Sequence, residues 1–304
     1  MRIPNKRVIR IEPYGALIHT TNPPVTIRLN RQEARALLRY RGPFPRDLTA
    51  PEVVHLEISN RCNMNCRECY VREKTGAELT TEQWKRIIAD LAENNVLQCT
   101  FGGGEPFMRD DIFELASYVR QLGMNLAVTT NGTLLRGRGE LSLFDQINFS
   151  VHGDNLDALR RKIKTAARYT KVGINFVLSK FNARHLTHVA RYCRDENVEL
   201  LLLTYKPVIG DVGNVVKPSD VMWCAQSLAR LGVPVAVDGL ACGMCYAARR
   251  FVDVDSVGNV YPCSFIRVPL GNLLRTSLKN IWRRRRVPSS CPYGGDCNEN
   301  KRWR

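Results

Sequence analysis

The chain is 304 residues long, is 44% hydrophobic and carries 45 Lys and Arg against 29 Asp and Glu, for a formal net charge of +16. This composition supports a substantial buried core and excludes disorder as the dominant state. No apolar run approaches the roughly 18 to 20 residues of a membrane span, and the N-terminal MRIPNKRVIRIEPYG lacks the apolar segment of a secretory signal. We therefore expect a cytoplasmic protein with one large domain and an appendage, or with two medium domains.

The N-terminal part, residues 1–50, contains three short strand-like runs, VIRIEP, ALIHTT and VTIRLN. Pro-Tyr-Gly and Asn-Pro-Pro turns separate them. A short helix is expected over Ala34–Leu38. We predict that this part forms a small β-rich extension that precedes the main domain.

The central part, residues 51–239, alternates apolar strand-like runs with helical patterns. The predicted strands are Val53–Ser59, Gln98–Gly103, Asn125–Thr130, Gln146–Val151, Gly173–Ser179 and Glu199–Tyr205. The first predicted helix begins after Thr80, in a T-x-x-Q capping box, and the others lie near Ile112–Leu122, Ala158–Tyr169, Ala183–Asn197 and Asp220–Leu231. This alternation predicts a parallel sheet, open or curled into a barrel, with the chemistry at the carboxyl ends of the strands.

Eleven cysteines in a reducing compartment argue for metal ligation together with a few buried thiols. Cys99, Cys193 and Cys224 stand alone in apolar or helical patterns and are interpreted as core residues. Cys62, Cys66 and Cys69 instead form a C-x3-C-x2-C cluster directly after the first strand of the repeat. Three thiolates can hold a 4Fe-4S cluster with one open iron, whereas structural zinc normally takes four ligands. The spacing alone leaves both possibilities open.

The segment CNMNCRECY resembles the signature of the radical S-adenosylmethionine (SAM) enzymes, in which the amino and carboxylate groups of SAM chelate the open iron. Relatives usually have an aromatic residue just before the third cysteine, whereas this chain has Glu68 there and Tyr70 just after. The resemblance extends to GGEP at residues 103–106, TTNG after the third strand and NFSVHG on the fourth. It implies an α/β fold with a partial (β/α)6 TIM-like barrel of the radical SAM type.

The same resemblance implies a SAM site. The residues it assigns to SAM binding are Gly103, Gly104, Glu105, Asn131 and Ser150. Glycines permit close approach of the backbone to a ligand, and the Glu105 carboxylate suits the SAM ammonium. Relatives also place an Arg near the SAM carboxylate. Arg160 and Arg161 are candidates for that role, but a solvated helix face explains such a charge pair as well.

The C-terminal part, residues 240–304, follows the end of the strand and helix alternation and contains a second set of cysteines. Its five cysteines are Cys242, Cys245, Cys263, Cys291 and Cys297. With DVDSVGNVYPC and LGNLLRTSLKNIW, they resemble the auxiliary-cluster extension called SPASM or, in its shorter form, Twitch. This implies one auxiliary 4Fe-4S cluster, with Cys245, Cys263 and Cys297 as the firmest ligands and with Cys242 and Cys291 competing for the fourth place. A zinc ribbon is the rival interpretation.

The resemblance implies that one electron splits SAM into methionine and a 5'-deoxyadenosyl radical, which abstracts hydrogen from a substrate. An auxiliary cluster that accepts an electron would permit a net oxidation or a crosslink, and so an oxidoreductase-type enzyme. We expect a peptide or protein substrate, because the N-terminal segment resembles the one that precedes the core in peptide maturases, and short strands can bind a peptide by strand addition. The alternatives are a small-molecule dehydrogenase or cofactor-biosynthesis enzyme and, more distantly, a non-catalytic zinc protein that binds nucleic acid.

The positive net charge favours acidic partners. An acidic peptide substrate and a low-potential electron donor such as flavodoxin or ferredoxin fit this balance. The densest basic run, Arg283–Arg286, continues a helical pattern and is interpreted as a solvated helix face. Without interleaved aromatic residues or a known nucleic-acid fold, nucleic acid is a minor possibility, and no membrane partner is expected.

Overall fold

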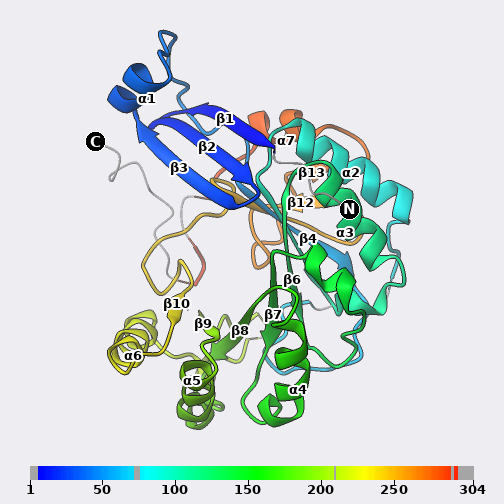
Figure 1. The fold of residues 1–304 in the computed structure, drawn as a ribbon, viewed down its shortest axis with the longest axis vertical. Coiled ribbons are helices and arrows are strands. Elements are labelled where there is room, and N and C mark those ends of the chain that lie inside the picture. Colours follow the sequence, from blue (N-terminus) through cyan, green and yellow to red (C-terminus); the bar gives the residue numbers. More distant parts are fainter. Residues whose placement is uncertain (1–5, 72–75, 209, 289–290, 294–304) are drawn as a thin grey trace.

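The computed structural model describes residues 6–71, 76–208, 210–288 and 291–293. These residues form two sheets, one of three strands in the order β1-β2-β3 and one of ten in the order β10-β9-β8-β7-β6-β5-β4-β11-β12-β13. Figure 1 shows the small sheet at one end of the molecule and the large sheet curving away from it, with helices along its outer face. Among the described residues, no helix has the length and apolar character that crossing a membrane requires.

The N-terminal extension is the antiparallel sheet of β1 (Arg7–Glu12), β2 (Gly15–Thr21) and β3 (Pro24–Asn30), followed by α1 (Arg31–Leu37). The three predicted strands and the helix are confirmed. A buried ion pair anchors this sheet, because Arg10 and Glu12 lie 2.5 Å apart while Arg10 also donates to the carbonyl oxygens of Ala50 and Pro51. The Glu12 carboxylate in turn accepts bonds from Thr49. The extension is therefore fastened to the start of the main domain through polar contacts.

The predicted parallel strands of the main domain are confirmed to within two residues at each end. They are β4 (Val53–Ser59), β5 (Gln98–Gly103), β6 (Asn125–Thr130), β7 (Gln146–Ser150), β8 (Lys171–Leu178) and β9 (Glu199–Thr204). The helices between and after them are α2 (Thr81–Glu93), α3 (Ile112–Gln121), α4 (Leu156–Ala166), α5 (Leu186–Asp195) and α6 (Pro218–Arg230). Short 3-10 turns precede or follow several of them, at η1 (Pro106–Met108), η2 (Gly139–Leu143), η3 (Ala183–His185) and η4 (Val212–Asn214).

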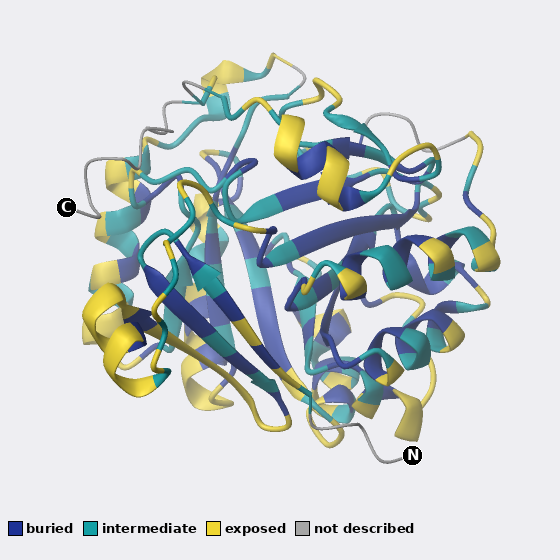
Figure 2. Cartoon of the chain, turned by 90° about the horizontal axis from the view of Figure 1, so that it is seen from above, coloured by how far each residue is buried: buried dark blue, intermediate teal, exposed yellow. Residues whose placement is uncertain are grey.

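Strand β4 shows how the sheet separates its core from its site. Val54, Leu56 and Ile58 are fully buried in the cluster that includes Trp84 of α2. Because side chains alternate along a strand, His55, Glu57 and Ser59 point to the opposite face. Figure 2 shows the strands largely buried and the outer helical faces exposed. The apolar face thus holds the helices, while the polar face is left for the site.

The large sheet continues at both edges beyond the six predicted strands. Strand β10 (Val235–Val237) pairs in parallel with β9, and β11 (Phe251–Val254) pairs in parallel with β4. Two short antiparallel strands, β12 (Asn259–Tyr261) and β13 (Gly271–Asn272), follow β11. The C-terminal part therefore covers the edge of β4, which would otherwise expose unpaired backbone groups.

Helix α7 (Leu278–Arg284) carries the first half of the basic run at residues 283–286. Arg283, Arg284 and Arg286 are exposed, as a solvated face predicts. Arg285 differs, because its guanidinium lies 3.6 Å from the Trp282 ring centroid and donates to the Ala248 carbonyl oxygen. This arginine packs the helix against the domain instead of facing solvent.

Candidate functional site

The C-x3-C-x2-C cysteines occupy the loop after β4, at the carboxyl end of the parallel strands. All three line a cavity of about 580 Å³, and so do three cysteines of the C-terminal part, Cys245, Cys263 and Cys291. Cys242 is not among the described residues that line this cavity, and Cys297 lies outside the described part of the chain. The fold thus brings together two cysteine sets that lie some 180 residues apart in the sequence.

The spread of these thiols tests which metal group they fit. Sulfurs bound to one zinc ion at about 2.3 Å lie roughly 3.8 Å from one another. Within the described ranges, the only His, Cys, Asp and Glu group with ligand atoms all within 4.8 Å is His55, Glu57 and Asp253, which contains no cysteine. No three cysteine sulfurs of the described chain therefore lie as close together as a preformed zinc site requires.

The glycines after β5 pack against the backbone of the cysteine loop. Gly104 N donates to the Ser59 carbonyl oxygen at 2.7 Å, and Glu105 N donates to the Arg61 carbonyl oxygen at 2.8 Å. A Cβ atom would lie 2.3 Å from the Ser59 oxygen at Gly103 and 2.0 Å from the Arg61 oxygen at Gly104. Only glycine fits this approach. Both glycines also line the cavity.

The Glu105 side chain is completely buried. One carboxylate oxygen accepts bonds from the Thr130 hydroxyl at 2.7 Å and Phe107 N at 3.1 Å, and the other accepts from Asn131 N at 2.7 Å. Burial raises the pKa of Glu105, and these three bonds oppose the rise. Glu105 therefore fixes the turn that carries Asn131, while its predicted contact with the SAM ammonium stays a prediction.

Asn131 and Ser150, at the ends of β6 and β7, both line the cavity. The Asn131 amide donates to the Asn63 side chain at 2.9 Å and accepts from Thr133 N at 2.9 Å. This bond ties the end of β6 to the loop between the first two cysteines. The predicted roles of Asn131 and Ser150 in SAM binding are compatible with their place in the cavity lining and stay predictions.

Arg160 and Arg161 lie on α4 and do not reach the cavity lining in the described structure. Arg160 pairs with Asp157 on the same helix and lies over the Tyr192 ring. The arrangement favours the helix-face interpretation of this charge pair.

Sequence reasoning missed a contact between the cysteine loop and the segment after β7. One ring nitrogen of His152, Nδ1, is bonded to the Glu68 carboxylate, and the other, Nε2, lies 3.4 Å from the Cys66 sulfur. Burial opposes protonation of this ring, but its bonds to Cys66 and Glu68 prevail and raise the pKa of His152 to about 10. The signal that was available in the sequence is Glu68 itself, at a position where relatives usually carry an aromatic residue.

A row of aromatic rings lines the cavity. Tyr70, next to Cys69, lies 5.5 Å from Phe265, and Phe265 lies 6.1 Å from Tyr293, as measured between ring centroids. All three rings line the cavity, and the Lys206 ammonium lies 4.6 Å from the Phe265 centroid. Part of the cavity wall, the aromatic wall, is therefore formed by these three rings.

A buried charge network connects β4 to β11 on the polar face of the sheet. His55 Nδ1 and an Asp253 carboxylate oxygen lie 2.5 Å apart, and the register pairs these two residues directly. Arg267 donates to Asp253 at 2.8 Å and also to Glu57. Burial and the neighbouring Asp253 raise the pKa of Glu57 to about 7, although Arg267 opposes the rise. Because Arg267 already neutralises the carboxylates, this cluster forms an ion-pair network and is not a free cation site.

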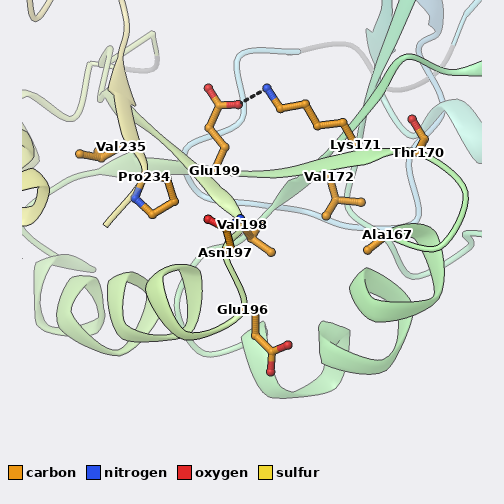
Figure 3. Close-up of a pocket in the computed structure, with 10 residues that line it drawn as sticks. All are labelled: Ala167, Thr170, Lys171, Val172, Glu196, Asn197, Val198, Glu199, Pro234 and Val235. Carbon is orange, nitrogen blue, oxygen red and sulfur yellow. Dashed lines mark ion pairs between the residues drawn. The ribbon is translucent and has the colours of Figure 1, made fainter. Parts of the chain in front are cut away.

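A second cavity, of about 600 Å³, lies at the amino ends of β8, β9 and β10. Figure 3 shows the Lys171 and Glu199 side chains pointing toward each other there, and the two pair at 2.6 Å. Glu196 extends away from the sheet and pairs with Lys164. No cysteine or histidine of the described chain lines this cavity, so its polar groups satisfy one another without forming a reactive set.

Two family models match the chain. The model of the radical SAM superfamily matches residues 56–199, and the model of the SPASM iron-sulfur cluster-binding domain matches residues 245–291. The first range contains Cys62, Cys66 and Cys69, and the second begins at Cys245 and ends at Cys291. These matches confirm the predicted fold class and the predicted cofactors, which are SAM, a 4Fe-4S cluster and an auxiliary iron-sulfur cluster.

The similar proteins include a synthase and a maturase. Fe-coproporphyrin III synthase of Methanosarcina barkeri is 31% identical over 200 residues, which cover 59% of this chain and 49% of that protein. Mycofactocin maturase MftC of Mycolicibacterium smegmatis is 27% identical over 284 residues, which cover 79% of this chain and 72% of that protein. The matched part thus spans about half the length of the first relative.

A solved structure matches most of the fold. It is the crystal structure of Streptococcus suis SuiB bound to precursor peptide SuiA, with a TM-score of 0.73 and 15% identity, covering 92% of this chain and 88% of that chain. At this identity, the likeness shows the fold alone.

Proposed function

The chain is a radical SAM protein with a SPASM-type iron-sulfur extension, and from this premise we propose that it is an oxidoreductase-type enzyme that abstracts hydrogen from a peptide or protein. The observation that carries the proposal is the single cavity lined by both cysteine sets. The two iron-sulfur clusters, when bound, would supply the electron that cleaves SAM and a second redox centre. The proposed domain limits are 1–50, 51–239 and 240–304, with the last part contributing β11 to the central sheet.

Within this proposal, the two cysteine sets hold different clusters. Cys62, Cys66 and Cys69 hold the SAM-binding cluster. The auxiliary cluster takes Cys245, Cys263 and Cys291, because these three share the cavity, with a fourth ligand from Cys297 or Cys242. The cysteines need a reducing compartment to remain thiols, and a cytoplasmic location is part of the proposal.

The chain's own residues shape the SAM side of the cavity. Gly103 and Gly104 let the end of β5 pack directly against the backbone of the cysteine loop, and Glu105 orients the end of β6 that carries Asn131. Ser150 completes this side at the end of β7. The aromatic wall of Tyr70, Phe265 and Tyr293 limits access of water to the cavity.

Two observations support a peptide substrate. Mycofactocin maturase MftC is similar over most of this chain, and SuiB, whose structure holds a precursor peptide, has the same fold. The N-terminal sheet offers a docking edge, because β3 is an edge strand with exposed Val25 and Ile27. An extended peptide can add to such an edge as a further strand. The net charge of +16 favours an acidic peptide and an acidic donor such as flavodoxin or ferredoxin.

A cofactor-biosynthesis enzyme is the second candidate, because Fe-coproporphyrin III synthase is 31% identical over 200 residues. The experiment that separates the two candidates starts from protein reconstituted without oxygen and supplied with SAM and reductant. One reaction receives short acidic peptides encoded next to the gene, and the other receives a porphyrin.

We expect 5'-deoxyadenosine formation to rise with a peptide, and that peptide to lose hydrogen atoms or gain a crosslink by mass spectrometry. Cys263→Ala should still cleave SAM but leave the peptide unfinished. Turnover of the porphyrin and of none of the peptides would overturn the peptide proposal in favour of cofactor biosynthesis.

A further inference from the structure

We propose that His152, held by Glu68, is a positioning residue that donates a hydrogen bond to the Cys66 thiolate and thereby raises the reduction potential of the cluster at Cys62, Cys66 and Cys69. The inference rests on the proposed role of these cysteines and names a regulator of their redox chemistry.

The geometry fixes the imidazole from both sides. Nε2 lies 3.4 Å from the Cys66 sulfur, within hydrogen-bonding distance for sulfur, and Nδ1 is bonded to Glu68. The Glu68 side chain is only 7% exposed and the His152 side chain 20%. Water therefore competes only weakly for the groups that form these two hydrogen bonds. The His152 backbone is held as well, because its N–H donates to the Asn155 side chain at 2.8 Å. The ring therefore has one defined orientation at the cysteine loop.

Charge decides which group donates. The Glu68 carboxylate faces Nδ1, and the sulfur of Cys66, a cluster ligand in the proposed function, faces Nε2. That sulfur accepts hydrogen bonds, so the geometry directs an Nε2–H at it. A hydrogen bond to a ligand sulfur withdraws negative charge from a cluster, which favours the reduced state. Glu68 acts through His152, because its bond to Nδ1 fixes the orientation of the ring.

The departure of the motif from its relatives has a physical reason in this contact. An aromatic residue at position 68 would not bind Nδ1, and the ring would lose its fixed orientation. The chain has Glu68 at this position and His152 in NFSVHG opposite it, so two unrelated segments supply one hydrogen-bonded unit. The pair adds a side-chain donor at Cys66 to a cysteine loop that Asn63 already ties to Asn131.

The test is an anaerobic redox titration followed by electron paramagnetic resonance on the full, reconstituted chain. The signal that changes when SAM is added reports the cluster with the open iron. The variants are His152→Ala, which removes the donor, His152→Gln, which can offer a neutral donor, and Glu68→Gln, which removes the carboxylate charge. His188→Ala is the matched control, because His188 is exposed on α5 and far from the cysteine loop in sequence.

The bond is present in both oxidation states, so only the difference in its strength between them changes the ratio of reduced to oxidised cluster. The whole charge-assisted bond contributes roughly a tenfold to hundredfold factor, which limits the fall in the midpoint potential to about 59 to 118 mV for one electron. We expect a fall within this limit in His152→Ala, a smaller fall of the same sign in His152→Gln and Glu68→Gln, and no change in His188→Ala.

Unchanged potentials in His152→Ala and Glu68→Gln, with iron content equal to wild type, would overturn the inference. If His152→Ala fails to hold iron, the midpoint potentials of His152→Gln and Glu68→Gln replace it in the test. Potentials equal to wild type in both variants would then overturn the inference. A wild-type protein without any SAM-responsive cluster would instead refute the proposed function, so the two failures are distinguishable.

Discussion

Single side chains around the cysteine loop are held by bonds that the chain itself provides. Glu105 accepts three hydrogen bonds, Asn131 bonds to Asn63, and His152 bonds to Glu68. Such buried contacts fix positions in advance, so that ligand binding does not have to order them. These side-chain hydrogen bonds therefore determine how well the cysteine loop is pre-organised for its cofactors.

Glu105→Ala removes the acceptor of three donors, among them Asn131 N. We expect SAM binding to weaken about tenfold to a hundredfold, because one charge-assisted contact contributes roughly 1.5 to 3 kcal/mol. The iron content should stay near that of wild type. Equilibrium binding of SAM measures the effect, with the exposed Glu93→Ala as control. SAM affinity equal to that of the control would remove Glu105 from the site.

Gly104→Ala places a Cβ atom 2.0 Å from the Arg61 carbonyl oxygen, a distance that forces the backbone of the cysteine loop to move. We expect the variant to lose most of the iron held by the loop. Gly139→Ala is a matched control, because nothing lies within 4 Å of its added Cβ. Iron analysis after reconstitution measures the difference, and equal iron in the two variants would contradict the packing argument.

At the scale of elements, the parallel pairing of β4 with β11 joins the C-terminal part to the barrel. Four residue pairs, from Phe251 with Val53 to Val254 with Leu56, align the two strands in parallel. The same register brings Asp253 to His55, and Arg267 completes the network with Glu57. A change in these charges should therefore affect the stability of this pairing and of the cavity above it.

The pKa of Glu57 predicts how this pairing depends on pH. Its pKa is raised from 4.5 to about 7, so the folded protein binds a proton more tightly than the unfolded chain does. The pKa of His55 is also raised, because its bond to Asp253 outweighs burial. The stabilisation from both groups is present at low pH and is lost as the pH rises, for Glu57 between about 4.5 and 7.

Thermal unfolding of the loaded protein at pH 5.5 and pH 8 should therefore show a larger loss of stability in wild type than in Glu57→Gln. The difference is expected to reach at most about 2 kcal/mol, since only the range from pH 5.5 to the pKa near 7 contributes and one unit corresponds to about 1.4 kcal/mol. Glu93→Gln, on the exposed side of α2, should behave as wild type does. An identical pH dependence in Glu57→Gln and wild type would contradict the network.

The sequence predicted those helices and strands that a pattern of neighbouring residues encodes. The strands from β4 to β9 are apolar runs separated by helical patterns, and Thr80 and Gln83 form the predicted capping box of α2. Strand β11 was not predicted, because a run of four residues with a central Asp253 becomes a strand only against the edge of β4. The role of Arg285 and the pairing of His152 with Glu68 were missed for the same reason, since both depend on residues distant in the chain.

At the scale of the whole molecule, the fold places both cysteine sets on one cavity while the surface carries a net charge of +16. A cationic surface raises the rate at which acidic proteins are encountered, and salt screens that attraction. The N-terminal sheet adds an exposed edge at one end of the molecule (Figure 1).

Salt provides a test of the charge argument. With flavodoxin as donor, we expect SAM cleavage to slow severalfold as NaCl rises from about 0.05 to 0.3 M, because screening weakens long-range attraction. With dithionite as reductant, the rate should change little. Production of 5'-deoxyadenosine measures both rates. The same salt dependence with both reductants would mean that the surface charge does not guide the donor.

The most direct test of the central claim, two iron-sulfur clusters on one cavity, is iron and sulfide analysis of protein reconstituted without oxygen. Two four-iron clusters predict about eight of each per chain in wild type, and about four in a variant with Cys62, Cys66 and Cys69 all replaced by Ala. Zinc as the main metal, or a triple variant that retains all of its iron, would contradict the claim.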